Sequence, residues 1–336
     1  MVSKKILILV IIVCCAINVY AQKQNKPVKI IFDSDMGPDY DDAGAIAILH
    51  ALADRGEATI LATMASTKYE GVAGVLNVFN TYFKRPGIPV GVPKGNALIL
   101  KDWQHWTDTL LARYPHKIKS NKEARDAVKL YRKILAAQPE HSVTIVTVGF
   151  FTNLSGLLST GADTYSPLSG RELVKRKVKV LVSMAGKYPS GYEFNIDKDI
   201  PAANYVFENW QSPIIFSGFE IGKKIEAGIP LVKNDSIKNN PVKDVFRISI
   251  PLAAEDSAGR KSWDETAVLV AIKGYSPFYE LHKGNIGKVA PDGKNTWNDK
   301  GKGHAYLVEK LDYKKVQSLI NTLIMHQPNA KNKNVR

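Results

Sequence analysis

Short apolar runs bounded by charges or turn residues alternate with longer stretches of helical periodicity along the chain. The runs are rich in β-branched residues and predict buried strands, whereas apolar side chains three and four residues apart predict helices. The predicted strands are 28–32, 59–65, 88–92, 143–148, 178–184, 213–216 and 305–309. The predicted helices are 43–53, 71–83, 124–137, 154–158, 200–210, 264–272 and 313–325. This alternation predicts an α/β fold with a largely parallel, Rossmann-like central sheet flanked by helices.

The remaining segments contain no repeat, low-complexity block or long linker that would divide the chain. Residues 97–115 have an irregular pattern, and residues 229–256 have a mixed, mainly helical one. A chain of this length suits one large α/β domain or two small ones, and the absence of a linker favours one. We therefore expect a single domain at 29–326, preceded by a polar leader at 22–28 and followed by a polar tail at 327–336.

The first 21 residues have the parts of a secretory signal peptide. Lys4 and Lys5 give a positive start, residues 6–13 are apolar, and the segment 19–21 ends in a small residue suited to cleavage. The apolar run is short for a membrane span. We therefore expect cleavage after Ala21, export to the periplasm or the outside, and no stable membrane insertion of the mature protein.

Cysteine content and charge exclude several classes of function. Both cysteines, Cys14 and Cys15, fall within the predicted signal peptide, so the mature protein would have no disulfide, cysteine nucleophile or cysteine-ligated metal. The full chain has a formal net charge of +14, but its basic residues are scattered and not interleaved with aromatic residues. We therefore expect no nucleic acid among its partners.

The stretch from residue 33 to residue 42 carries the most distinctive chemistry. It contains Asp33, Asp35, Asp39, Asp41 and Asp42, placed between a predicted strand and a predicted helix. Ligands of open α/β sheets bind at such strand ends, and crowded carboxylates need a compensating cation. Hard oxygen ligands suit Ca²⁺ or Mg²⁺ more than zinc. The stretch thus predicts a divalent-metal site, the alternative being an exposed acidic turn.

Three further polar clusters follow predicted strands or open predicted helices: 148–153, 187–195 and 262–264. In a parallel sheet all of them could meet at one edge. Asp35, Asp42 and Asp264 could then share one cation, with a main-chain carbonyl as a further ligand.

Together these motifs resemble the nucleoside hydrolase family, calcium-dependent enzymes that cleave the N-glycosidic bond of ribonucleosides. Residues 33–37 and 41–43 match its signature Asp-x-Asp-x-Gly-x-Asp-Asp-Ala, with two extra residues between them. Residues 146–153, Glu193-Phe194-Asn195, and Asp264 with 266–268 resemble the later motifs in the same order. The resemblance extends from about Lys29 to about Met325.

The resemblance implies a role for each matching residue. Ca²⁺ would be bound by the carboxylates of Asp35, Asp42 and Asp264 and by the carbonyl of Val148. Asp41 would be the general base that activates the attacking water. Glu193 and Asn195 would bind the ribose hydroxyls of a small nucleoside substrate. The family also implies a homodimer or homotetramer.

The chain departs from the family pattern where the leaving base would lie. Trp263 stands where many members have a histidine proposed as the acid. It resembles instead an aromatic residue that stacks on purines, the alternative being a core residue at a helix start. Trp103 or Trp106 could lie on the other side of the base, although packing roles are favoured for both. His105 is a candidate acid, although a surface position is favoured.

Two departures concern the sugar. Asp39 lies within the insertion and could add a metal or substrate contact. Ser66-Thr67-Lys68 and Lys187 replace positions where relatives carry ribose-binding asparagines. Lys68 or Lys187 could therefore serve a modified or phosphorylated riboside.

Three other interpretations compete with a nucleoside hydrolase. The Asp33-Ser34-Asp35 sequence also fits phosphatases with an Asp-x-Asp nucleophile loop, but these do not explain Asp41-Asp42 or the 193–195 motif. A calcium-dependent nucleoside- or sugar-binding protein without turnover is a second alternative. An EF-hand is the third, but the acidic stretch follows a predicted strand and lacks the terminal glutamate.

Overall fold

The computed structural model describes residues 26–328. The predicted signal peptide, both cysteines and most of the polar leader and polar tail lie outside these residues. No helix within 26–328 has the length and apolar character needed to cross a membrane.

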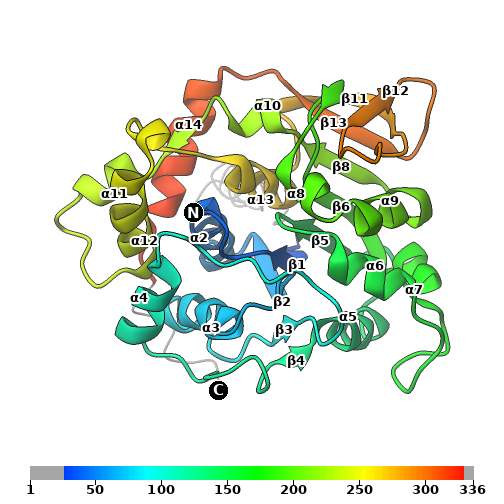
Figure 1. Ribbon diagram of the computed structural model, residues 1–336, viewed down its shortest axis with the longest axis horizontal. Helices are drawn as coiled ribbons and strands as arrows, with labels where there is room; N and C mark the ends of the chain where they lie inside the picture. The colour runs from blue at the N-terminus through cyan, green and yellow to red at the C-terminus, as the bar shows by residue number, and fades with distance from the viewer. Residues whose placement is uncertain (1–25, 329–336) are drawn as a thin grey trace, which may run out of the picture.

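An eleven-stranded sheet forms the centre of the molecule (Figure 1). Its first eight strands in spatial order are parallel: β4 (Arg125–Asp126), β3 (Val90–Val92), β2 (Ala58–Ala65), β1 (Val28–Ser34), β5 (Val143–Thr147), β6 (Val178–Met184), β8 (Ile214–Ser217) and β13 (His304–Glu309). Three antiparallel strands extend it: β11 (Tyr279–Ile286), β12 (Asn295–Asn298) and β7 (Ser190–Gly191). The prediction of a largely parallel α/β sheet is therefore confirmed.

Helices cover both faces of this sheet (Figure 1). One face carries α2 (Asp41–Asp54), α3 (Val72–Tyr82), α4 (Trp106–Arg113), α10 (Phe219–Gly222), α11 (Ile229–Lys233), α12 (Pro241–Ser249), α13 (Trp263–Lys273) and α14 (Tyr313–Ile324). The other carries α5 (Ala127–Ala136), α6 (Thr152–Leu158), α7 (Gly170–Lys177) and α9 (Ile200–Asn209). Short α8 (Phe194–Lys198) follows β7, and a small ribbon pairs β9 (Glu226–Ala227) with β10 (Arg260–Lys261).

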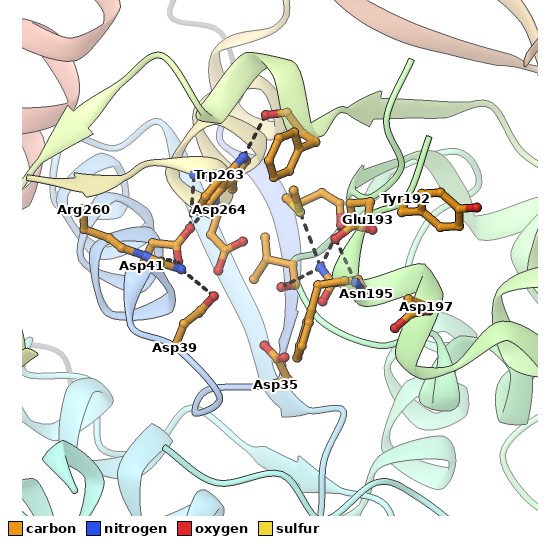
Figure 2. A pocket seen from close by; sticks show the side chains of 14 residues that line it. Asp35, Asp39, Asp41, Tyr192, Glu193, Asn195, Asp197, Arg260, Trp263 and Asp264 are labelled. Carbon is orange, nitrogen blue, oxygen red and sulfur yellow. Dashed lines mark hydrogen bonds and ion pairs between the residues drawn. The ribbon is translucent and has the colours of Figure 1, made fainter. Parts of the chain in front are cut away.

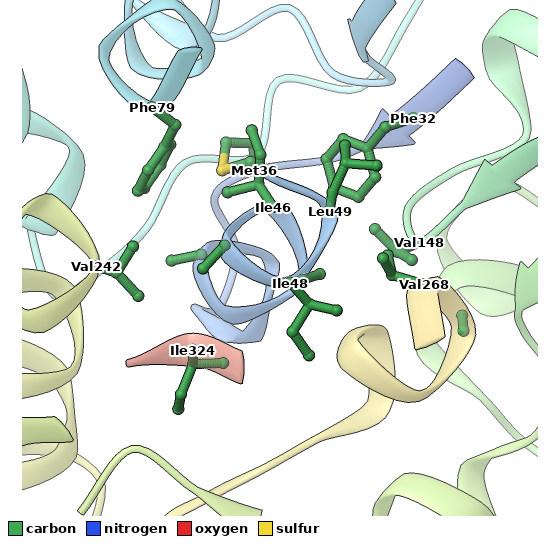
Figure 3. Packing of buried hydrophobic residues seen from close by; sticks show 14 of the residues in the cluster. Phe32, Met36, Ile46, Ile48, Leu49, Phe79, Val148, Val242, Val268 and Ile324 are labelled. Atoms are coloured by element: carbon green, nitrogen blue, oxygen red, sulfur yellow. The ribbon is translucent and has the colours of Figure 1, made fainter. Parts of the chain in front are cut away.

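Helix α2 is buried on all sides, which explains its apolar composition. Ile46, Ile48 and Leu49 pack against the sheet and the surrounding helices, as Figure 3 shows. Helix α13 packs beside α2 and is also apolar around most of its surface. Both helices carry aspartates in their first turn, and these aspartates lie near each other because the two helices are packed together.

Several regions differ from the predicted elements, among them α7, which was not predicted, and β4, which lies within the predicted helix 124–137. Helix α4 lies in the stretch expected to be irregular. It was missed because its sequence is polar and few of its residues, such as Trp106 and Leu110, are buried. The strands β11 and β12 were not predicted. Strand β11 contains charged residues and a glycine along its length, so it has no apolar run to identify it.

Candidate active site

A cavity of about 440 Å³ opens at the carboxyl ends of β1, β5 and β6 (Figure 2). All four polar clusters predicted from the sequence contribute to its wall. Asp35, Val148, Glu193 and Asp264 each come from a different cluster. The expectation that these clusters meet at one sheet edge is therefore confirmed.

Asp33 is buried beneath the cavity and does not line it. Its carboxylate accepts hydrogen bonds from the Tyr131 hydroxyl at 2.8 Å and from Asn153 Nδ2 at 3.1 Å. Burial raises the pKa of Asp33 to about 7, although both hydrogen bonds lower it. Because Asn153 also donates to the Ala65 carbonyl, Asp33 links the ends of β1 and β2 and fixes the start of the acidic loop.

Asp35, Asp42 and Asp264 form a group of buried carboxylates. No basic side chain in the described ion pairs neutralises their negative charges. Burial raises the pKa of Asp35 and of Asp264 well above the usual range, and neighbouring aspartates raise both further. Burial and the charge of Asp41 raise the pKa of Asp42 to about 6. Ser34 Oγ and the Met36 amide donate to Asp42 Oδ1, but its Oδ2 is buried without a hydrogen-bond partner. These three groups therefore suit a cation.

Carboxylate and carbonyl oxygens are the donor type that hard divalent cations prefer. Within residues 26–328, no group of three or more His, Cys, Asp or Glu side chains is arranged so that it could hold a metal ion. Calcium takes six to eight oxygen ligands, which commonly include carbonyls and water. Val148 lines the cavity, and the hydrogen bond that its carbonyl accepts from Asn195 Nδ2 is long, at 3.4 Å. Asp35, Asp42 and Asp264 are thus oxygen donors that lie near one another without forming a ready ion site.

Asp41 holds the start of α13 in place. Its Oδ2 accepts hydrogen bonds from the backbone N–H groups of Trp263 at 3.1 Å and Asp264 at 3.2 Å. Its Oδ1 accepts from Arg260 Nη2 at 2.7 Å and from Arg260 Nε at 3.0 Å. Both oxygens of the predicted general base are thus engaged, and Asp41 connects α2, α13 and β10.

Glu193 and Asn195 lie on the opposite side of the cavity (Figure 2). The Glu193 carboxylate accepts hydrogen bonds from the backbone N–H groups of Gly186, Asn195 and Ile196. Asn195 Nδ2 donates to the Met184 carbonyl at 3.0 Å. With Nδ2 committed to the backbone, Asn195 Oδ1 is the atom suited to accept from a substrate hydroxyl.

The buried carboxyl of Glu193 gives a testable pH dependence. Burial raises its pKa from 4.5 to about 7. Between these values the folded protein keeps a proton that the unfolded chain releases, so stability falls as pH rises. Between pH 5 and pH 7.5 the wild type should lose about 2–3 kcal/mol of its free energy of unfolding through this group, and Glu193→Gln should not show that loss. Urea unfolding in chelator measures it, and equal pH slopes for variant and wild type would contradict it.

Trp263 begins α13 and lies half-buried in the cavity wall. Its ring stacks on Phe219 with centroids 5.3 Å apart, and its Nε1 donates to the Phe219 carbonyl. The guanidinium of Arg260 lies 5.1 Å from the Trp263 ring centroid. Trp263 is therefore both a packed residue at a helix start and part of an aromatic wall, to which Tyr192 and Phe194 add exposed rings.

The other aromatic candidates lie outside the cavity lining. Trp106 is fully buried, and its Nε1 donates to the Asp39 carbonyl at 3.0 Å, so it anchors the acidic loop. Trp103 is 59% exposed. His105 is exposed beside Asp108. The favoured alternatives, packing for Trp106 and a surface position for His105, match the structure. The packing role favoured for Trp103 is wrong, because most of its side chain is exposed.

The two candidate lysines have different surroundings. Lys187 is exposed and its Nζ lies 5.5 Å from the centroid of Phe219, a cavity-lining ring. Its backbone N–H and carbonyl are both hydrogen-bonded by the side chain of Asn295. Lys68 Nζ donates to the Gly95 carbonyl, so of the two only Lys187 lies near a ring of the cavity wall.

Arg260 and Phe219 were not predicted from the sequence. Arg260 lies in the cavity wall and pairs with Asp39 and Asp41. Its position four residues before Asp264 is the only local signal that could have identified it. Phe219 follows β8 and carries no local sign of its contact with Trp263.

Gly149 provides a test of how closely the acidic loop packs. A Cβ there would lie 2.6 Å from Ser66 Oγ and 2.9 Å from Asp35 Cβ, closer still to the Asp35 amide. Gly149→Ala should therefore displace Asp35, lower activity and cost about 1–3 kcal/mol of stability. Urea unfolding measures the cost. Gly161→Ala is the control, because nothing lies within 4 Å of its added Cβ. Equal stability of the two variants would contradict this packing.

The comparisons with known proteins agree with this geometry. Residues 30–318 match the family model described as inosine-uridine preferring nucleoside hydrolase. The chain is 26% identical over 234 residues to the inosine-uridine preferring nucleoside hydrolase of Crithidia fasciculata, covering 66% of this chain and 70% of that protein. A plant nucleoside hydrolase structure aligns with a TM-score of 0.69 at 20% identity, covering 89% of this chain and 99% of that one. A purine-preferring ribonucleoside hydrolase from Gardnerella vaginalis aligns with a TM-score of 0.69 at 18% identity, covering 88% and 98%.

Proposed function

Because this chain belongs to the inosine-uridine preferring nucleoside hydrolase family of N-glycosyl hydrolases, we propose that it is an exported, Ca²⁺-dependent hydrolase of ribonucleosides. The products would be a free base and ribose. The single observation that supports the proposal best is the shared cavity, which Asp35, Val148 and Asp264 line together with Glu193 and Asn195.

The cation would be held by Asp35, Asp42, Asp264 and the Val148 carbonyl. Bound there, Ca²⁺ would lower the pKa of water and orient the ribose hydroxyls. Glu193 and Asn195 would bind those hydroxyls from the other side and fix the sugar for attack. The reaction passes through a ribosyl cation, so the negative charge of the surrounding carboxylates would favour its formation.

Asp35 and Asp41 both line the cavity, and Asp35 would be the better placed of the two to take a proton from a water bound there. Asp41 accepts four hydrogen bonds, two of them from a guanidinium, which leaves its oxygens poorly placed to take a proton. Asp35 lines the cavity, and both burial and Asp42 raise its pKa. We therefore propose Asp35 as the proton acceptor and Asp41 as the residue that positions Asp264, while the prediction that Asp41 is the base is tested in the Discussion.

The leaving base would lie against the aromatic wall made by Trp263 and Phe219. Phe219 covers part of Trp263, so the base would meet this pair together with the exposed rings of Tyr192 and Phe194. Aromatic walls favour the larger purine ring, which is the basis for proposing a purine preference.

Release of free base and reducing sugar from a substrate panel tests the proposal. The panel contains inosine, adenosine, guanosine, uridine, cytidine and their 5′-phosphates, with Ca²⁺ and then with chelator. Ca²⁺-dependent cleavage with purines ahead supports the proposal. Equal rates on pyrimidines overturn the purine preference alone. Preference for the phosphates would indicate a modified riboside, and ligand binding without products would indicate a binding protein.

Export and assembly need separate measurements. We propose that residues 1–21 are removed on export; N-terminal sequencing of the mature protein starting at Gln22 would support this. The expected homodimer or homotetramer is tested by light scattering of the processed protein.

A further inference from the structure

Arg260 is the buried centre of an ion-pair cluster beside the cavity (Figure 2). Its Nη2 lies 2.7 Å from Asp41 Oδ1 and 2.5 Å from Asp39 Oδ2. Its Nη1 lies 3.5 Å from Asp256 Oδ2, which also accepts from the Tyr40 hydroxyl. One guanidinium therefore faces three carboxylates, two from the acidic stretch 33–42 and one from the segment just before Arg260.

The position of the guanidinium is fixed from several sides. It lies between two aromatic rings, 4.9 Å from the Tyr40 centroid and 5.1 Å from that of Trp263. Its backbone belongs to β10, which pairs with β9. The preceding Gly259 has a φ of +132°, and a Cβ there would lie 2.8 Å from the Ala227 carbonyl oxygen. Such constraints give a planar, bidentate donor one orientation.

The carboxylates near the cavity consequently form two groups. Asp39, Asp41 and Asp256 face Arg260, whereas Asp35, Asp42 and Asp264 have no basic partner among the described ion pairs. Consecutive residues on a helix point about 100° apart, so the adjacent Asp41 and Asp42 can belong to different groups.

We propose that Arg260 is a positioning residue that divides the acidic cluster, holding Asp39 and Asp41 on itself and leaving Asp35, Asp42 and Asp264 for the cation. Without it, two freed carboxylates would lie beside the metal ligands and compete for the ion. The cation would then be held more tightly but in a less productive place. This inference rests on the proposed calcium-dependent function and adds a residue that no sequence motif identified.

Calcium binding measured by titration calorimetry, alongside kcat and KM on the best nucleoside, tests the inference. The wild type should bind one Ca²⁺. Arg260→Gln should bind Ca²⁺ more tightly or bind a second ion, while kcat falls about 10- to 100-fold. A residue with a merely structural role would weaken calcium binding and thermal stability together. Unchanged or weaker calcium binding in Arg260→Gln overturns the inference, whatever happens to kcat.

Two further variants keep the test decisive. Arg260→Lys keeps the charge, so it should bind calcium like the wild type and have an intermediate kcat. This variant replaces Arg260→Gln in the test if Arg260→Gln fails to fold. Tighter calcium binding by Arg260→Lys would then overturn the inference. The double variant Arg260→Gln/Asp39→Asn should reverse part of the tighter binding.

Arg85→Gln is the matched control, because Arg85 pairs with Asp54 at the opposite end of α2, about 20 Å away. A wild type that neither binds Ca²⁺ nor cleaves nucleosides would instead refute the proposed function.

Discussion

Asp35→Asn is expected to lower kcat by about 10²- to 10⁴-fold, the range for loss of a positioned base. Asparagine keeps the shape of the side chain but cannot accept a proton, and it gives the cation a weaker ligand. Asp35 lines the cavity, and neither of its carboxylate oxygens receives a described hydrogen bond from outside the acidic group. Base release from the preferred nucleoside at saturating Ca²⁺ measures the effect.

Two comparisons make this result interpretable. Asp299→Asn changes an exposed aspartate that pairs with His282, so it should leave kcat unaffected. Calcium titration of Asp35→Asn then separates its two roles, because a base defect persists at saturating Ca²⁺ and a ligand defect is relieved. Near-normal kcat in Asp35→Asn would remove this residue from the chemistry.

The parallel part of the fold could be predicted because its strands are buried on both faces. Strand β6 matches its predicted bounds, and β1 and β5 differ by one or two residues. Such strands form continuous apolar runs, which the sequence displays directly. The antiparallel extension has no such signal, because β11 is half-exposed and β7 has only two residues. Its pairing depends on contacts such as those of Asn295 with the Lys187 backbone, which are distant in sequence.

The candidate site shows the same division between local and long-range signals. Asp35, Glu193 and Asp264 follow strands or open helices, so the sheet topology alone brings them together. Arg260 reaches Asp41 from 219 positions away, and its guanidinium could have pointed to solvent in many other folds. Sequence pattern predicts where polar groups gather, but not which of them neutralise one another.

Asp41→Asn distinguishes the two assignments of the base and should lower kcat about 10²-fold or more. Asp41 Oδ2 receives two backbone N–H groups and Oδ1 receives Arg260. An amide group in place of either oxygen would oppose these donors with its own N–H groups. The start of α13 would shift, and Asp264 with it. We therefore expect calcium affinity to fall together with kcat.

If Asp41 is instead the base, as the family resemblance implies, the variant should lose kcat and keep its calcium affinity. Calcium titration of the folded variant, with Asp35→Asn measured beside it, decides between a residue that positions the metal ligand and one that takes the proton.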